Sequence, residues 1–411
     1  MTQEDPITNA LGQAVNGGDL AGAVTLIWRG GTVVHTAAVG SRDIETRLPI
    51  ERDTIFRIAS MSKPITSLAA MMLFEEGRFQ LEDPITRLAP EFATMRVLTS
   101  PDGSIDDTVP AERQITFEDL LTQRSGLTYG PLHRGPIAKA YDDALGGDID
   151  SWVAPDDWIR GLASLPLIDQ PGAGFHYSHS TDLMGLLIAR MEGASLGEVL
   201  QRRIFGPLEM KDTGFIVPRE NRARRSALHG FDDDGRLVKR LTGPDESTLP
   251  ERPDDMPYES GGQGLWSTLD DYLAFARIFV GRGSVDGFRL LKPETVNLMT
   301  TNRLTETQIA GAKLMGMPML GAGHGFGLGV AVVIDPEKAS ASRPCGGGLG
   351  SVGWPGGFGG WWRADPEDDS VMIFLSHSIV ELDQLARGYG LGVFIAINEF
   401  QALASQVVVN L

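Results

Sequence analysis

The sequence predicts an α/β (α+β) fold in which an antiparallel sheet is built from both ends of the chain and flanked by helices. Strand patterns with turn residues occur near residues 21–39 and again from about residue 326 onward. Between them, short helical patterns alternate with loops rich in proline, glycine and aspartate. We therefore expect an α/β domain made of residues 1–85 and 266–411 and an inserted helical and loop domain at 86–265, with a ligand cleft between them.

The first α/β segment contains a predicted hairpin and a predicted helix. Ala21 to Val39 alternates apolar and other residues around a turn at Arg29–Gly31. Pro64 suits the first turn of the helix that follows, and Gly77 suits its end. The apolar face of this helix follows the spacing i, i+3, i+4, i+7, i+8 and comprises Ile65, Leu68, Ala69, Met72 and Leu73.

The middle segment carries three signals for the beginning of a helix. Thr116–Asp119 resembles a capping box, Ser180 or Thr181 caps a second helix, and Ser195–Glu198 forms a capping box before a third. Asp232 to Pro257 is acidic and lacks periodicity. We expect it to be a loop that forms a lid or wall of the cleft.

The C-terminal segment returns to sheet and helix patterns. A helix is predicted at Thr268–Phe279, a strand at Phe326–Ile334, and a hairpin from Phe358–Ala364 and Val371–Ser376. Leu391–Leu411 is apolar, but asparagine, glutamine and glutamate side chains interrupt it, so we expect a helix of the core.

Composition and charge exclude several kinds of partner. The 411 residues carry 36 basic and 54 acidic side chains, a net charge of −18, which disfavours nucleic acid and anionic membrane surfaces as partners. No stretch approaches the roughly 20 apolar residues of a membrane span. The single cysteine, Cys345, forms no intramolecular disulfide, and we expect it to be structural. With no signal-peptide pattern at Met1–Asn9, these features predict a cytoplasmic protein.

The motif Ser60-Met61-Ser62-Lys63 is a candidate nucleophile and base. At the beginning of a helix, residues three apart face the same side. A serine hydroxyl attacks only when a base takes its proton, and an amine serves when an apolar setting favours its neutral form. Phe56, Ile58 and Ile65 supply such a setting. The alternative is a helix-capping serine followed by an exposed lysine.

Two further motifs lie far from Ser60 in the sequence. Tyr177 precedes a capped helix, and its phenol could relay a proton if Lys63 lay nearby; alternatively, it packs its ring and makes a surface hydrogen bond. Trp354-Pro355-Gly356-Gly357 follows a glycine-rich stretch, where a substrate can approach the backbone closely. The N–H groups of Ser60 and Gly357 could form an oxyanion hole.

Two other patterns are weaker. Gly193–Gly197 matches the G-x-S-x-G nucleophile elbow, but a helix precedes Ser195 where the elbow requires a strand. His176 and His179 are three residues apart, yet no cluster of carboxylates or cysteines accompanies them, so we expect no metal site.

In combination and order, these motifs resemble the serine β-lactamase and penicillin-binding-protein superfamily, most closely the class C-like branch known as family VIII carboxylesterases. The resemblance spans nearly the whole chain. It rests on Phe56–Lys63, Ile115–Leu121, Ser125–Leu127, Tyr177-Ser178, Ile204–Met210, Asp212–Phe215, Ser260–Leu265 and Gly353–Gly357.

This resemblance implies a β-lactamase-like fold and a serine hydrolase without cofactor or metal. Ser60 looks like the acylated nucleophile, Lys63 like its base and Tyr177 like the proton relay. In this reading the substrate is bound by residues of the remaining motifs, namely Trp354, Gly356, His179 and Ser125.

Two departures from the superfamily pattern bear on the substrate. His179 stands where the β-lactamases have the asparagine of Tyr-x-Asn, and Trp354-Pro355-Gly356 replaces Lys-Thr-Gly. The missing lysine would pair with the carboxylate of a β-lactam or peptide, so an uncharged small or short-chain acyl ester is the expected substrate. The alternatives are a β-lactamase or D-alanyl-D-alanine peptidase, and a non-catalytic binding or scaffold protein of the same fold.

Overall fold

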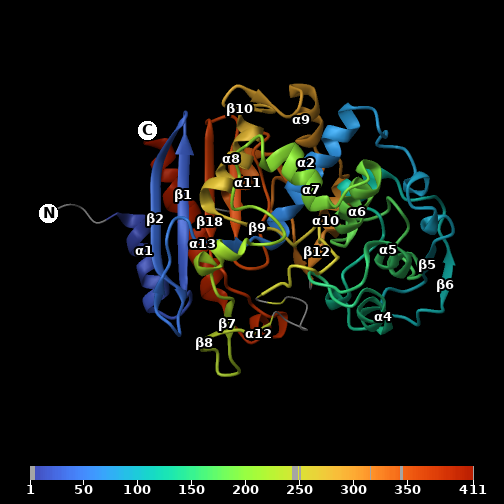
Figure 1. The fold of residues 1–411 in the computed structure, drawn as a ribbon, viewed down its shortest axis with the longest axis horizontal. Coiled ribbons are helices and arrows are strands. Elements are labelled where there is room, and N and C mark those ends of the chain that lie inside the picture. Colours follow the sequence, from blue (N-terminus) through green and yellow to red (C-terminus); the bar gives the residue numbers. More distant parts are fainter. Residues whose placement is uncertain (1–4, 243–248, 250, 315, 343–345, 411) are drawn as a thin grey trace.

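An eight-stranded antiparallel sheet forms one side of the molecule (Figure 1). The computed structural model describes residues 5–242, 249, 251–314, 316–342 and 346–410. In spatial order the strands are β14 (His324–Phe326), β15 (Ala331–Val333), β16 (Val352–Gly353), β17 (Trp361–Asp365), β18 (Ser370–Leu375), β1 (Gly22–Arg29), β2 (Thr32–Asp43) and β3 (Leu48–Pro49).

The two ends of the chain meet in the middle of this sheet. β1 pairs antiparallel with β18, with Val24 opposite Leu375 and Arg29 opposite Ser370. The hairpins β1–β2 and β17–β18 confirm the two predicted hairpins. The predicted antiparallel sheet with strands from both ends is therefore confirmed.

Both faces of the sheet are covered by helices. In β1, Val24 and Leu26 belong to the main core, whereas Ala23 and Ile27 belong to a second core on the opposite face. The period of two of a strand sends successive side chains to opposite faces, so β1 is apolar almost throughout. The second core lies beneath α1 (Pro6–Asn16) and α13 (Leu391–Val409), and α8 (Leu269–Val280) packs on the other face.

The rest of the molecule is helical and lies beyond α2 (Ser62–Glu75), on the side of Figure 1 away from both termini. Its helices between α2 and α8 are α3 (Phe117–Leu121), α4 (Pro136–Leu145), α5 (Pro155–Ala163), α6 (Ser180–Glu192) and α7 (Leu196–Leu200). The C-terminal half adds α9 (Pro293–Met299), α10 (Glu306–Gly311), α11 (Pro336–Ser342) and α12 (Leu382–Ala386).

Short two-stranded ribbons connect these helices. They pair β4 (Phe56–Arg57) with β9 (Trp266–Ser267), β5 (Arg96–Leu98) with β6 (Thr108–Pro110), β7 (His229–Phe231) with β8 (Leu237–Lys239), β10 (Ser284–Val285) with β11 (Phe288–Arg289), and β12 (Lys313–Leu314) with β13 (Met317–Pro318). The main core contains residues from both sides of 85/86 and 265/266, so the proposed domain boundaries stay a prediction.

The predicted strand at Phe326–Ile334 is wrong in one respect, because the segment turns back on itself. β14 ends at Phe326 and β15 begins at Ala331, with the two strands paired antiparallel. Gly329 has a φ of +88° in the turn, and a Cβ on Gly327 would lie 1.9 Å from the Met299 carbonyl oxygen. The apolar residues on both sides of these glycines suit a strand, so the sequence pattern does not distinguish the turn from a continuous strand.

Two other segments need comment. Within Asp232–Pro257, predicted to be a loop, β8 pairs with β7, while residues 243–248 and 250 lie outside the described residues, as does Cys345. By length and composition α13 is apolar enough to cross a membrane. In the structure one side of α13 packs on the sheet and on α1, as expected for a helix of the core.

Candidate active site

Ser60 lies in a tight turn that leads into α2. The chain leaves β4 and forms a single 3₁₀ turn at Ala59–Met61, in which Ala59 adopts a positive φ of 46°. Such a backbone conformation is uncommon for residues other than glycine and is concentrated at functional sites. Ser60 is 6% exposed and Lys63 only 1%, so the alternative of an exposed lysine after a capping serine is wrong.

Lys63 makes three polar contacts. Its Nζ lies 3.5 Å from Ser60 Oγ, 3.0 Å from the Tyr129 hydroxyl and 3.1 Å from the Gly262 carbonyl oxygen. A neutral amine has two hydrogens and one lone pair. A neutral Lys63 amine in this geometry would donate its two hydrogens to Tyr129 and Gly262 and keep its lone pair for the proton of Ser60.

Tyr129 is a site residue that the sequence analysis missed. Its phenol is buried and donates to Asp182 Oδ2 at 3.1 Å. Burial, followed by the charge of Asp182, raises the pKa of Tyr129 well above its usual value, so the phenol keeps its proton. The only signal for Tyr129 was its place two residues after the Ser125–Leu127 motif.

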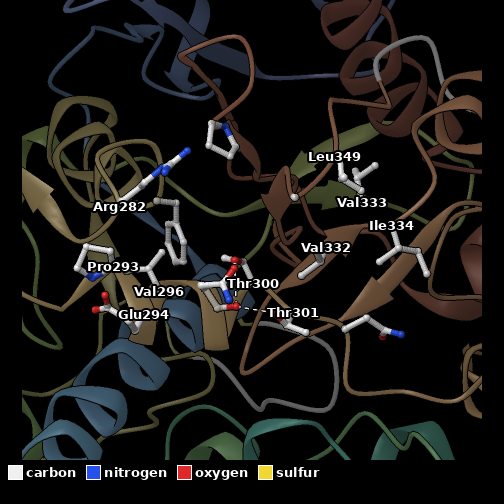
Figure 2. Close-up of a pocket in the computed structure, with 15 residues that line it drawn as sticks. Arg282, Pro293, Glu294, Val296, Thr300, Thr301, Val332, Val333, Ile334 and Leu349 are labelled. Atoms are coloured by element: carbon white, nitrogen blue, oxygen red, sulfur yellow. Dashed lines mark hydrogen bonds between the residues drawn. The ribbon is translucent and has the colours of Figure 1, made fainter.

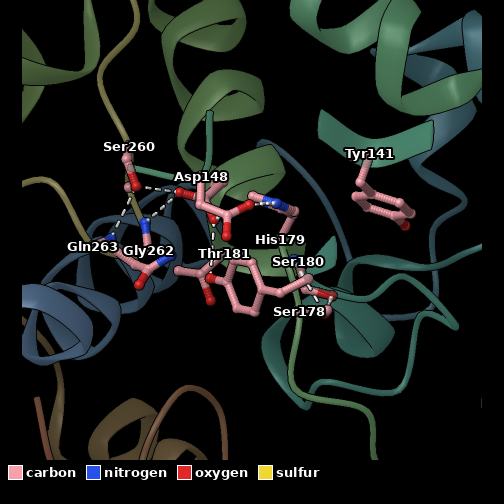
Figure 3. A network of polar contacts seen from close by, with 12 residues as sticks. Tyr141, Asp148, Ser178, His179, Ser180, Thr181, Ser260, Gly262 and Gln263 are labelled. Atoms are coloured by element: carbon pink, nitrogen blue, oxygen red, sulfur yellow. Dashed lines mark hydrogen bonds and ion pairs between the residues drawn. The ribbon is translucent and has the colours of Figure 1, made fainter. Parts of the chain in front are cut away.

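Asp182, in the first turn of α6, contacts several buried polar groups, among them Ser260, Gly262 and His179, which Figure 3 labels. Its Oδ1 accepts from the Ser260 hydroxyl at 2.5 Å and from the Gly262 N–H at 3.0 Å. Its Oδ2 lies 3.2 Å from His179 Nδ1. Burial alone would raise the pKa of Asp182, but the hydrogen bond and the charge of His179 hold it below the usual range.

His179 was expected to contact substrate, and the structure corrects this. The ring is completely buried, and its Nε2 lies 3.3 Å from Asp148 Oδ1. Burial disfavours the imidazolium, but the hydrogen bonds with Asp148 and Asp182 outweigh burial and raise the pKa of His179. An acidic partner on each ring nitrogen makes His179 part of an internal charge network.

Tyr177 lies beside Lys63 and faces it with its ring, not with its hydroxyl. Lys63 Nζ is 4.4 Å from the centroid of the Tyr177 ring, and the Tyr177 oxygen accepts a hydrogen bond from Trp354 Nε1 at 3.1 Å. Catalytic hydrogen bonds often form only once substrate is bound. The structure thus brings Tyr177 and Trp354, predicted from distant motifs, together next to the Ser60–Lys63 pair.

The backbone at Gly356 and Gly357 lies against the turn that carries Ser60. A Cβ on Gly356 would lie 2.5 Å from the Ile58 carbonyl oxygen, whereas one on Gly357 would meet nothing within 4 Å. Within the described residues, the N–H groups of Ser60 and Gly357 have no hydrogen-bond acceptor. They are available for a developing oxyanion.

Ser125 serves the frame of the site, which differs from its predicted contact with substrate, whereas Gly356 has a structural role and its contact with substrate stays a prediction. Gly356 donates its N–H to the Gly360 carbonyl and allows the close approach to Ile58. Ser125 is fully buried, hydrogen-bonded to Ser180 Oγ at 2.7 Å and to the Leu127 N–H. Both residues hold neighbouring segments in place.

The competing patterns are explained by local structure. Ser195 caps α7 in a capping box with Glu198, so the prediction of a cap is confirmed and the elbow context is absent. His176 pairs with Asp169 at 2.8 Å. Over the described part of the chain, no group of three or more histidine, cysteine or acidic side chains could hold a metal ion.

A cavity of about 750 Å³ lies elsewhere, between the end of α8, α9 and β15 (Figure 2). Its wall includes Arg282, Glu294, Val333 and Leu349 and shares no residue with the Ser60 site. Thr301, also in the wall, donates its hydroxyl to a backbone carbonyl, so it is not activated by a base. The cavity is therefore separate from the Ser60 site.

Comparison with known proteins shows which family this chain belongs to. The Beta-lactamase family profile matches residues 7–391. The chain is 44% identical over 365 residues to protein Rv1367c of Mycobacterium tuberculosis, covering 88% of this chain and 87% of that protein. It is 31% identical to Esterase EstB of Burkholderia gladioli, with 90% and 89% covered.

Solved structures support the same conclusion. EstCE1, described as a hydrolase with promiscuous acyltransferase activity, superposes with a TM-score of 0.75 at 26% identity, covering 96% of this chain and 97% of that one. The β-lactamase-like fold, the sheet built from both ends and the esterase relative agree with one another. The chain belongs to the beta-lactamase family, within the serine β-lactamase and penicillin-binding-protein superfamily, and resembles its esterases.

Proposed function

We propose that this protein is a serine carboxylesterase of the family VIII type that hydrolyses small or short-chain acyl esters through an acyl-enzyme on Ser60. One observation carries the proposal: Lys63 Nζ is buried, lies 3.5 Å from Ser60 Oγ, and donates to both Tyr129 and Gly262. This arrangement leaves the amine lone pair for the serine proton.

The reaction follows in two halves. Ser60 Oγ attacks the ester carbonyl carbon while its proton passes to Lys63, and the oxyanion is held by the N–H groups of Ser60 and Gly357. The intermediate collapses, the alcohol leaves with a proton relayed by Tyr177, and the acyl group stays on Ser60. Water, deprotonated through the same groups, then attacks the acyl-enzyme and releases the carboxylic acid.

The preference for an uncharged ester is supported by Trp354. The indole stands where the superfamily motif has lysine, and its N–H is already donated to Tyr177. Its ring packs with Phe175 and Phe326 in an apolar cluster, which offers no positive charge to a substrate carboxylate. The 31% identical relative EstB is named an esterase.

Kinetics with p-nitrophenyl acetate and butyrate test this proposal. Ser60→Ala should lower kcat/KM by about 10³-fold or more, because the nucleophile is lost. Ser195→Ala, which removes only a helix cap, should keep kcat/KM near that of the wild type. Full activity in Ser60→Ala with loss in Ser195→Ala would contradict the assignment, and nitrocefin turnover far above ester turnover would favour a β-lactamase.

A second candidate is acyl transfer to an alcohol from the same acyl-enzyme. Ser60 is only 6% exposed and lies near the apolar Trp354 cluster, which limits the access of bulk water. An apolar alcohol would then compete with water for the acyl group. Adding 1-butanol to a p-nitrophenyl butyrate assay should yield butyl butyrate in the wild type, and exclusive release of butyrate would contradict this candidate.

A further inference from the structure

The carboxylate of Asp182 anchors both groups that accept hydrogen bonds from Lys63. Its Oδ2 accepts from the Tyr129 hydroxyl at 3.1 Å, and its Oδ1 accepts from the Gly262 N–H at 3.0 Å. Because Tyr129 has a single hydrogen and gives it to Asp182, only its oxygen lone pair faces Lys63. The position of Asp182 therefore determines where both hydrogens of a neutral Lys63 amine point.

An unpaired carboxylate at this place would also work against the proposed mechanism. Asp182 is completely buried, and a buried anion near an amine favours the ammonium form, which cannot take a proton from Ser60. The partner that offsets this charge is His179, which is completely buried and sits between Asp182 and Asp148 (Figure 3).

We infer that Asp182 and His179 are positioning residues for Lys63: Asp182 aims the amine at Ser60 through Tyr129 and Gly262, and the His179 cation balances the Asp182 charge so that the amine stays neutral. The inference rests on the proposed function of Lys63 as the base. His179, which stands in place of the asparagine of Tyr-x-Asn, thus has an electrostatic role inside the protein.

Other charged and titratable groups near Lys63 are few in the described residues. Tyr129 stays protonated, Tyr177 presents its ring face to Nζ at 4.4 Å, and Tyr258 lies close to Asp182 and keeps its proton because burial raises its pKa. Asp148, with a side chain that is 20% exposed, meets His179 on the far side from Asp182. The pair Asp182–His179 is thus the ionic contact that sets the protonation state of Lys63.

The rate at which a fluorophosphonate labels Ser60, measured against pH, tests the inference directly. In this reaction the Ser60 oxygen forms a bond to phosphorus, fluoride leaves, and the serine proton passes to Lys63, so the acidic limb of the rate reports when Lys63 becomes neutral. His179→Gln removes the compensating cation and should move this limb up by about one pH unit.

Asp182→Asn should move the acidic limb the other way, to lower pH, because the anion that favours the ammonium is gone. It should also lower the plateau rate about 10-fold, since an amide no longer holds Tyr129 and Gly262 in the same way. Opposite shifts from two neighbouring substitutions are not expected if the residues act only in packing. Asp271→Asn, at a buried aspartate of α8 that accepts from Thr213, is the matched control and should leave the limb in place.

Wild-type protein supplies a second measurement that does not depend on the folding of a variant. With ¹³C-labelled histidine, the buried His179 ring should show the chemical shift of an imidazolium throughout the acidic limb of Ser60 labelling. A neutral His179 ring in that pH range, or unshifted limbs in both variants, would overturn the inference while Ser60 labelling persisted. Labelling that survives in Ser60→Ala would overturn the proposed function itself.

Discussion

The two tyrosines beside Lys63, Tyr129 and Tyr177, contact it in different ways. Tyr129 accepts a hydrogen bond from Lys63 and donates one to Asp182. Its phenol therefore stays protonated and holds Lys63 in place. Tyr177 meets Lys63 through its ring face, and its oxygen accepts only from Trp354 among the described residues, so its own hydrogen remains available. This difference favours Tyr177 over Tyr129 as the proton relay.

Tyr129→Phe should lower kcat/KM for p-nitrophenyl butyrate about 10-fold, because Lys63 loses one acceptor and Asp182 loses one donor. Tyr141→Phe is the matched control: Tyr141 is equally buried, but its hydroxyl accepts from the Thr128 backbone N–H and does not meet Lys63. We expect it to lower the melting temperature while kcat/KM stays near that of the wild type. Equal losses of kcat/KM in the two variants would contradict the role of Tyr129.

At the residue scale, the sequence predicted the proposed catalytic residues better than the residues that hold them in place. Ser60, Lys63 and Tyr177 belong to short motifs with a known chemical logic, and the structure places them side by side. Asp182 reads in the sequence as an ordinary acidic residue in the first turn of a helix. Its contacts with Tyr129 and Gly262 span 53 and 80 residues, and no local pattern encodes contacts of that length.

At the scale of elements, the site depends on how closely the Trp354–Phe358 loop approaches the beginning of α2. A Cβ on Gly356 would lie 2.5 Å from the Ile58 carbonyl oxygen, and a Cβ on Gly360 would lie 2.7 Å from Met61 Sδ. Side chains at these positions would push the loop away from Ser60. The loop carries Gly357, so its distance from α2 sets the geometry of the proposed oxyanion hole.

Gly356→Ala should therefore lower kcat about 100-fold, which is the usual cost of losing one oxyanion-hole donor. The matched control is Gly161→Ala in α5, which packs against α4 and α6; there the added Cβ would lie 2.7 Å from the Ala144 carbonyl oxygen. Both variants should melt earlier, but only Gly356→Ala should lose kcat. Retained kcat in Gly356→Ala would show that the loop does not set the oxyanion hole.

The predicted cap of α6 by Ser180 or Thr181 is wrong, because the helix begins directly after His179 and has no side-chain cap. Several other predicted elements are confirmed. The α2 pattern, the Ser195 cap and both hairpins are present. Element prediction failed at Phe326–Ile334, because two glycines that turn the chain lie among apolar residues that suit a strand. The close approach of Gly327 to Met299 that requires the turn is a tertiary contact.

At the scale of the whole molecule, a buried ion pair connects the beginning of the chain with the helical region. Arg57, in β4, donates to both carboxylate oxygens of Asp150 at 2.6 and 2.8 Å, and both side chains are almost completely buried. Asp150 also accepts from the Leu249 N–H. Arg57 lies three residues before Ser60, so the same ion pair that joins these segments also holds the turn that carries Ser60.

Asp150→Ala should lower the free energy of unfolding by about 3 kcal/mol, because it leaves the Arg57 guanidinium buried without its anion. Urea denaturation followed by circular dichroism measures this change. Asp143→Ala, which removes the partner of the exposed Lys139, serves as the control and should leave the urea midpoint unchanged. A midpoint of Asp150→Ala equal to that of the control would contradict the importance of the buried pair.

Trapping the covalent intermediate tests the central claim most directly. After brief treatment with a fluorophosphonate, intact mass spectrometry should show one adduct per chain, and peptide mapping should place it on Ser60. Lys63→Ala should slow the formation of this adduct by about 100-fold or more, because the base that activates the hydroxyl is gone. An adduct on Ser195 or another residue, with Ser60 unmodified, would contradict the account.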